Sequence, residues 1–192
     1  MPPLEKHPLK PFLPTNARVL MLGSFPPQRK RWSMDFFYPN FQNDMWRIMG
    51  LLFFADKDVF VDKKEKRFRQ TEIIQFAEET GIAMYDTAEE VRRLKDNASD
   101  NFLEIVRPTD IDSLLAQLPL CQAIATTGEK ATEEVITQYH TQKPKIGDAV
   151  PLEIGQRSLL LYRMPSSSRA YPLSLETKAT YYHTMFHDLG IL

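Results

Sequence analysis

The chain of 192 residues has only one cysteine and lacks any long hydrophobic run. A single cysteine cannot form an intrachain disulfide or supply a multi-cysteine metal or iron–sulfur site. Because Cys121 lies in the apolar segment 120–124, we expect a small buried hydrophobic side chain. No segment reaches the roughly 18 apolar residues needed to span a bilayer, and the first thirty residues hold no apolar signal region. These absences predict a cytoplasmic protein without a membrane partner.

The sequence also lacks an excess of either charge. Its 24 Lys and Arg residues balance 25 Asp and Glu, which leaves a net charge of −1. The whole molecule therefore has no general attraction for phosphate, and any nucleic-acid face must be local. Basic residues do cluster at 29–31, 63–69 and 92–95, although each cluster alone is typical of a solvated surface.

Apolar runs alternate with segments of helical periodicity along the chain. The runs 18–23, 82–85, 122–128 and 158–164 predict buried strands. The helical spacing predicts helices over 44–54, 66–80, 109–118, 129–139 and about 175–189, with Gly81 as a C-cap and Thr109 as an N-cap. This alternation predicts one α/β domain over residues 1–192, with a central four-stranded mainly parallel sheet in a three-layer α/β/α arrangement. Residues 1–16 are rich in proline and are expected to be irregular.

Three segments follow the predicted strands and are candidates for a site. Pro26 and Pro27 make 23–39 a long loop at the carboxyl end of the first strand. In α/β sheets this end is where binding sites lie. The segments are Gly23-Ser24-Phe25-Pro26-Pro27, then Phe37-Tyr38-Pro39-Asn40-Phe41-Gln42-Asn43-Asp44-Met45-Trp46, and Met164-Pro165-Ser166-Ser167-Ser168-Arg169-Ala170-Tyr171.

Two other kinds of site are disfavoured. A serine hydrolase would need a Gly-x-Ser-x-Gly elbow and a partner histidine, but His7 and His140 fall in irregular or surface contexts. His183 and His187 are spaced to chelate a metal, yet no H-E-x-x-H pattern accompanies them. We expect both to be surface or cap residues of the last helix.

The three segments together resemble the motifs of the uracil-DNA glycosylase superfamily. The first is similar to the family's Gly-x-(Asp or Asn)-Pro loop, and Met164-Pro165-Ser166-Ser167-Ser168 looks like the last motif of thymine-DNA glycosylases. Tyr38-Pro39 with Asn43 and Trp46 resembles the Tyr-Pro-x-Pro-x-Asn-x-Phe-Trp stretch of the same enzymes. The segment 81–86 is similar to a stretch of the hypoxanthine-acting branch. The likeness spans about Val19 to Tyr171.

The resemblance implies a uracil-DNA glycosylase-like fold and a base-excision repair enzyme. Such an enzyme flips a deaminated or mismatched base out of DNA and cleaves its N-glycosidic bond, without a metal or redox cofactor. We expect it to work as a monomer in the cytoplasm, associated with the nucleoid. The implied substrate-binding residues are Gly23, Ser24, Phe25, Pro26, Phe37 and Tyr38, and the implied DNA-binding residues are Met164, Pro165, Ser166, Ser167, Ser168, Arg169 and Tyr171.

Within that reading, Tyr38 would stack on the flipped base and Phe25 or Phe37 would form a second wall. Arg169 or Tyr171 would fill the gap left in the base stack. We expect Arg29, Lys30, Arg31 and Arg169 to gather around the cleft and contact phosphates.

One position departs from the family pattern. Phe25 stands where the resemblance places a water-activating Asp or Asn, and a phenyl ring cannot orient water. The matching hypoxanthine-acting branch implies a catalytic role for Asn43, although an Asn at the start of a helix is also a common cap. Asp86 and Asp100 follow the second strand and are further candidates for activating water, with Asp100 expected at the surface in a salt bridge.

Two other functions remain open. The first is a DNA-binding protein that has kept the glycosylase fold and lost catalysis, for which Phe25 is the evidence. The second is a nucleoside hydrolase unrelated to DNA. The Arg169 loop disfavours it, because a free nucleoside leaves no base stack to fill.

Overall fold

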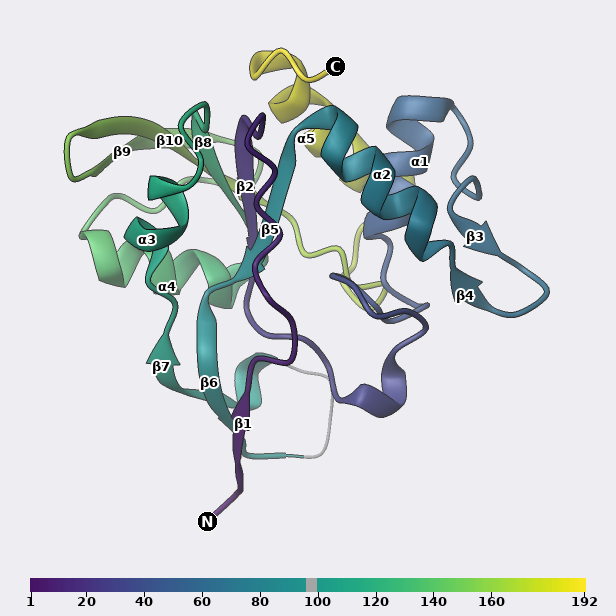
Figure 1. Cartoon of the computed structure of the whole chain (residues 1–192), viewed down its shortest axis with the longest axis horizontal. Coiled ribbons are helices and arrows are strands. Elements are labelled where there is room, and N and C mark those ends of the chain that lie inside the picture. Colours follow the sequence, from purple (N-terminus) through teal and green to yellow (C-terminus); the bar gives the residue numbers. More distant parts are fainter. Residues whose placement is uncertain (96–99) are drawn as a thin grey trace.

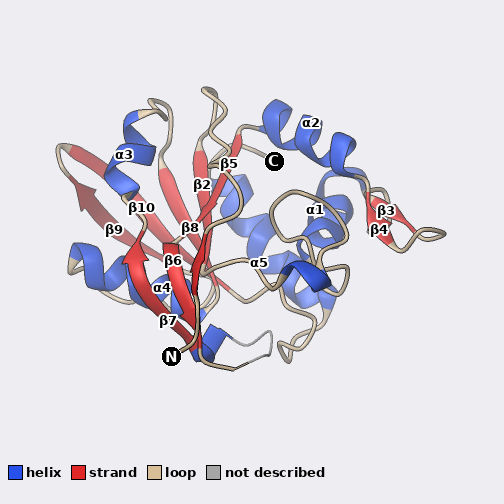
Figure 2. Ribbon diagram, turned by 60° about the horizontal axis from the view of Figure 1, so that its bottom comes forward, coloured by secondary structure: helices blue, strands red, loops and turns tan. Residues whose placement is uncertain are grey.

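The computed structural model describes residues 1–95 and 100–192 and has an α/β fold (Figure 1). The strands are β1 (Leu4–Lys6), β2 (Val19–Gly23), β3 (Val61–Asp62), β4 (Arg67–Phe68), β5 (Ile82–Asp86), β6 (Ala88–Arg93), β7 (Leu103–Pro108), β8 (Ala123–Thr127), β9 (Ala149–Ile154) and β10 (Arg157–Met164). The helices are η1 (Arg29–Arg31), α1 (Met45–Phe54), α2 (Gln70–Thr80), η2 (Asp100–Phe102), α3 (Ile111–Ala116), α4 (Glu129–Tyr139) and α5 (Leu175–Asp188). Helices α1, α2 and α5 lie on one side of the central sheet, and α3 and α4 lie on the other (Figures 1 and 2).

The central sheet has the strand order β5-β2-β8-β10-β9. The four predicted strands, β2, β5, β8 and β10, are confirmed, and all of them run parallel. The predicted count of four was too low, because β9 adds an antiparallel edge strand beside β10. Pro151 lies within β9. Proline has no N–H to donate, and it is tolerated in an edge strand because such a strand is paired on one side only.

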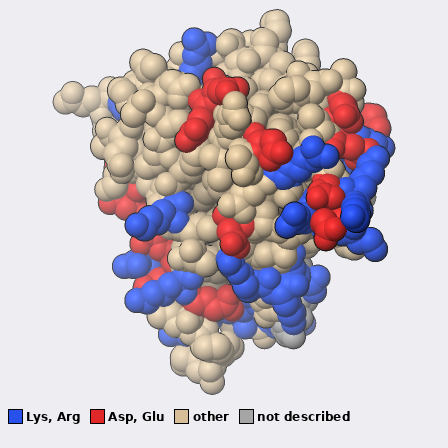
Figure 3. Space-filling view, turned by 45° about the vertical axis from the view of Figure 1, so that its right-hand side comes forward, with Lys and Arg blue, Asp and Glu red and all other residues tan. Residues whose placement is uncertain are grey.

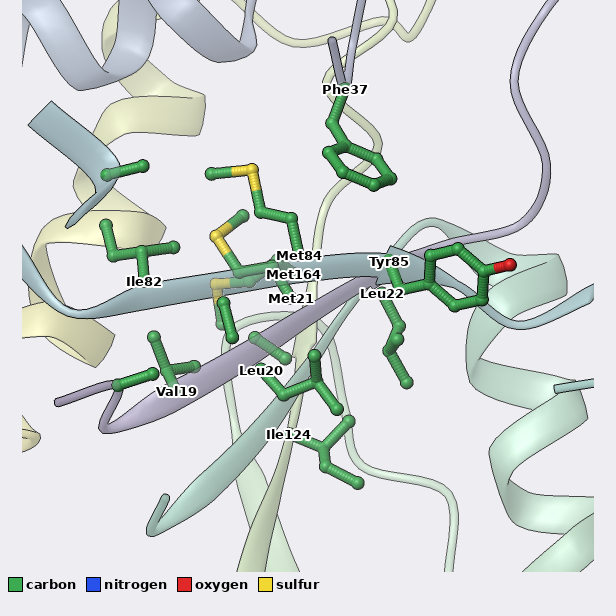
Figure 4. Close-up of a cluster of buried hydrophobic side chains, with 14 of the residues drawn as sticks. Val19, Leu20, Met21, Leu22, Phe37, Ile82, Met84, Tyr85, Ile124 and Met164 are labelled. Carbon is green, nitrogen blue, oxygen red and sulfur yellow. The ribbon is translucent and has the colours of Figure 1, made fainter. Parts of the chain in front are cut away.

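The core fills both faces of this sheet, because successive side chains of a strand point to opposite faces. Every residue of β2, β5 and β8 is buried. Figure 4 shows Met84 and Phe37 on one side of the strands and Leu22 and Ile124 on the other. Burial on both faces explains why these strands appear in the sequence as continuous apolar runs.

A second, smaller sheet has the order β1-β6-β7 and is antiparallel. It corrects two expectations. Residues 1–16 are not wholly irregular, because β1 pairs with β6 and Phe12 bridges to Met84. The segment after β5, for which the sequence predicted no strand, forms β6 and β7. Residues 96–99 lie outside the described residues.

Helix boundaries differ from the prediction at two places. Helix α2 begins at Gln70 rather than at residue 66, because Arg67 and Phe68 form β4. Helix α3 spans only Ile111–Ala116, and its cap is Asp110, whose carboxylate accepts a bond from Ser113 N at 3.1 Å. Thr109, the predicted cap, donates its hydroxyl to the backbone oxygen of Asp86 at 2.7 Å.

Other local predictions are confirmed. Gly81 ends α2 in the left-handed region with φ of 69°, as a C-cap glycine does. Cys121 is buried, and this burial raises the pKa of its thiol. Across residues 1–95 and 100–192, every helix is too short or too polar to cross a membrane.

Candidate active site

A pocket of about 140 Å³ opens at the carboxyl edge of the parallel strands. Each of the four strands or the loop that follows it contributes to the lining, through Gly23, Asp86, Thr127 and Ser166. The predicted site residues in the lining are Gly23, Ser24, Phe25, Pro26, Phe37, Tyr38, Asn43, Asp86, Ser166, Ser167 and Ser168. Met164, Pro165, Arg169 and Tyr171 are not among the lining residues. The fold thus brings most of the predicted residues to one pocket, while their roles stay predictions.

Tyr38 forms one wall of the pocket in a constrained conformation. Its φ of 53° is positive, which is uncommon for a residue with a side chain and is often found at functional sites. The phenol and the hydroxyl of Thr127 are hydrogen-bonded at 3.1 Å, and the ring meets Trp46 edge to face. Burial raises the pKa of Tyr38, so the phenol stays neutral at physiological pH. The wall is therefore an uncharged aromatic ring whose hydroxyl is fixed.

Of the two roles suggested for Asn43, the structure shows the helix cap. Its Oδ1 accepts a hydrogen bond from Met45 N at 2.9 Å, which satisfies one of the free N–H groups at the start of α1. Asp44 holds the N-cap position but makes no side-chain cap bond. Asn43 also lines the pocket. The cap bond occupies one lone pair of Oδ1, so the side chain can still offer an amide group to a bound base.

Asp86 lies at the end of β5 against the loop after β2. Its Oδ2 is 2.7 Å from Nε2 of His7, and the Asp86 side chain is 10% exposed. A Cβ at Gly23 would come within 2.5 Å of Oδ1, so glycine is required here by the close approach of the carboxylate. His7 was expected in an irregular or surface context, but its side chain is only 2% exposed. His7 lies in irregular backbone, as expected, but it is not at the surface, because the pairing of β1 with β6 places His7, directly after β1, beside Asp86.

Asp100 is a second carboxylate in the lining. It was expected as a salt-bridged surface residue, but it lies partly buried beside Ser24. Burial raises the pKa of Asp100, a hydrogen bond with Ser24 opposes this shift, and the nearby charge of Asp86 adds to it. Asp100 therefore holds its proton to a higher pH than an ordinary aspartate does.

Contacts with the second sheet, β1-β6-β7, hold the loop after β2 in place. Arg93 of β6 is 6% exposed on its side chain, and it donates two hydrogen bonds to the carboxylate of Glu5 and one to Pro26 O. Phe25 is 7% exposed and packs into a small apolar cluster with Ala88, Val91 and Leu103. The phenyl ring therefore anchors the loop to the second sheet.

The loop after β10, which carries Ser166, Ser167 and Ser168, contacts Asp44 at the start of α1 and Lys178 of α5. Lys178 has a fully buried side chain, and its Nζ donates to Asp44 Oδ2 at 3.1 Å and to Ser168 O at 2.7 Å. Arg169, which is half exposed, pairs with Asp44 Oδ1 at 3.2 Å. The hydroxyl oxygen of Ser166 accepts from Ser168 N, so that N–H is used within the loop while the hydroxyl proton can still be donated outward.

Removing the buried charge of Lys178 should destabilise the protein. Lys178→Met is expected to lower the free energy of unfolding by up to about 3–5 kcal/mol, since it leaves the buried carboxylate of Asp44 with only the half-exposed Arg169 as a cation. The double variant Asp44→Asn/Lys178→Met should recover part of this loss, because it leaves no buried charge unpaired, and Arg169, which then also loses its partner, is half exposed. Urea denaturation of the three proteins checks this. A loss below about 1 kcal/mol for Lys178→Met would show that the pair does not hold the loop.

None of the basic residues predicted to gather around the pocket, Arg29, Lys30, Arg31 and Arg169, is among its lining residues. Among the described residues, Arg93 is the basic residue of the pocket lining. Arg29 pairs with Asp35, stacks on Trp32, and lines a separate open groove with Arg67. Figure 3 shows Lys and Arg side chains gathered in the lower part of one face, with Asp and Glu among them. A phosphate-binding role for these residues stays a prediction.

Within residues 1–95 and 100–192, no group of three or more His, Cys, Asp or Glu side chains is arranged to hold a metal ion. His183 and His187 are exposed on α5 with their rings stacked at 6.2 Å, in line with the surface role expected for them.

Comparisons with known proteins support the fold. The chain matches no protein-family model and no curated protein. It is similar to a protein from Methanosarcina acetivorans whose solution NMR structure is described as that of a "putative Uracil DNA glycosylase". The two chains are 19% identical with a TM-score of 0.60, and the match covers 94% of this chain and 98% of the other. The chain therefore shares the α/β fold of that protein over almost its whole length.

Proposed function

We propose that this protein is a DNA glycosylase that hydrolyses the N-glycosidic bond of a deaminated base flipped out of DNA. The observation that carries the proposal is the pocket at the carboxyl edge of the sheet. There an aromatic wall, Tyr38, an amide, Asn43, and a carboxylate, Asp86, lie beside a loop of three serines. An aromatic ring can stack on any base, and serine hydroxyls can donate to the flanking phosphates. The solved relative described as a glycosylase adds support through its fold.

The proposed reaction assigns a role to each polar group. Water forms a bond to C1′ of the flipped nucleotide while the bond from C1′ to the base nitrogen breaks. Asp86 takes the proton that the water loses, and the bonding electron pair leaves with the base. Asn43 hydrogen-bonds the edge of the base, and backbone N–H groups at 23–25 stabilise its negative charge. Asp100, whose pKa is raised by burial, can donate a hydrogen bond to the leaving base.

A second candidate is a DNA-binding protein that no longer hydrolyses, and Phe25 favours it. The ring is buried in the apolar cluster of the second sheet and cannot activate water. The carboxylate of Asp86 in the same pocket argues against this candidate, because a carboxylate is a competent base.

The experiment that separates the two candidates is a substrate panel. Purified protein is incubated with oligonucleotides that carry uracil, hypoxanthine, xanthine or a mismatched thymine, and abasic sites are then cleaved with alkali. The glycosylase proposal predicts strand cleavage for at least one deaminated base and none for undamaged DNA. Binding to these DNAs without any cleavage would favour the second candidate. The monomeric state and the cytoplasmic location expected from the sequence stay predictions.

A further inference from the structure

His7 has a buried imidazole next to the pocket, and the proposed reaction does not use it. Its Nε2 lies 2.7 Å from Oδ2 of Asp86, although 79 positions separate the two residues in the chain. The side chain is 2% exposed, so the hydrogen bond is shielded from water. A contact of this kind between distant segments is built by the fold, through the pairing of β1 with β6.

Contacts of both its backbone and its ring hold His7 in place. His7 N donates to Glu89 O at 2.8 Å, and Nδ1 lies 2.9 Å from Leu9 O and 3.1 Å from Leu9 N. The ring of Phe25 meets it edge to face at 5.3 Å, and the ring of Tyr85 lies at 4.5 Å. These contacts fix the direction of Nε2, and with it the direction of the hydrogen bond to the carboxylate.

The two oxygens of Asp86 have different surroundings. Oδ2 faces His7, whereas Oδ1 lies against Gly23, and both Asp86 and Gly23 line the pocket. A carboxylate that is held by one oxygen presents the other in a single orientation. Proton transfer to a carboxylate depends on such orientation, because a base must lie within hydrogen-bond reach of the proton it takes. The arrangement suits a base whose second oxygen must stay aimed at a bound water.

We propose that His7 is a positioning residue, which holds Oδ2 of Asp86 so that Oδ1 can take the proton of the attacking water. The inference rests on the proposed function. In the step concerned, the water oxygen bonds to C1′, the bond from C1′ to the base breaks, and the water proton moves to Oδ1. His7 touches neither the base nor the sugar and acts only through Asp86.

Two substitutions of similar size and polarity test this role. The amide nitrogen of Gln is as many bonds from Cα as imidazole Nε2, whereas that of Asn is one bond shorter. His7→Asn should therefore lose the bond to Asp86 and slow single-turnover excision by about 10²-fold, the scale of a misplaced catalytic group. His7→Gln should restore most of the rate. His183→Gln, an exposed change on α5, is the control and should leave the rate unchanged.

A binding measurement tests the same inference without turnover. DNA with a pyrrolidine abasic analogue carries a cation that mimics the charged sugar, and DNA with a tetrahydrofuran analogue is its neutral counterpart. The wild type and His7→Gln should prefer the cationic DNA, whereas His7→Asn should lose this preference and keep its affinity for the neutral DNA. Equal preferences in the wild type and His7→Asn would overturn the inference. A preference that depends on His7 in a protein that excises no base would show that His7 positions Asp86 and would count against the proposed function.

Discussion

Asp86→Asn should lower the single-turnover rate of base excision by about 10³-fold at neutral pH, within the range that general-base catalysis contributes. The amide is nearly the same shape as the carboxylate, and its oxygen can still accept the bond from His7 Nε2. The pocket should therefore keep its form while the group that takes the water proton is lost. Affinity for DNA with a neutral abasic analogue should change little, and quench-flow kinetics with saturating enzyme measure the rate.

Asp100→Asn is the matched control for this prediction, because both carboxyls line the same pocket. Burial raises the pKa of Asp100, and an amide imitates the neutral carboxyl, so the rate should fall less than in Asp86→Asn. If Asp100→Asn instead costs more, Asp100 rather than Asp86 is the base.

Asn43→Ala should cut excision by on the order of 10²-fold, the effect of losing one preorganised polar group in an active site. The same change removes the bond to Met45 N and should cost about 1 kcal/mol of stability, as the loss of a helix cap does. Excision rate and melting temperature are measured on one preparation.

Asn43→Asp separates the two roles of this residue. A carboxylate can still accept the bond from Met45 N and is favoured at a helix N-terminus, but it cannot donate to a base. Its stability should stay near that of the wild type while its excision rate falls as in Asn43→Ala. An unchanged rate in both variants would leave Asn43 as a structural residue only.

The sequence predicted the central sheet well because burial on both faces leaves an unmistakable pattern. Strands β2, β5 and β8 are buried along their whole length and β10 over half of its length, and their parallel order places the loops that follow at one edge. That is why the resemblance of three separate loops to one family led to one pocket.

The second sheet was missed because its signals are weak. Strand β6 carries Glu89, Glu90, Arg92 and Arg93, which alternate with few apolar residues and look like a solvated segment. Its apolar side is completed by Phe25, from a loop more than sixty residues earlier in the chain. The burial of His7 and Asp100 depends on this sheet, so neither could be read from a local pattern.

The most direct test of the account is the release of free base from duplex DNA. The protein is incubated with duplexes carrying uracil or hypoxanthine, and free base and abasic sites are counted together by chromatography and alkaline cleavage. The proposed function predicts equal amounts of the two products from at least one duplex with the wild type, and almost none with Asp86→Asn. Tight DNA binding without release of any base, or release that persists undiminished in both Asp86→Asn and Asn43→Ala, would contradict the claim that this pocket excises bases.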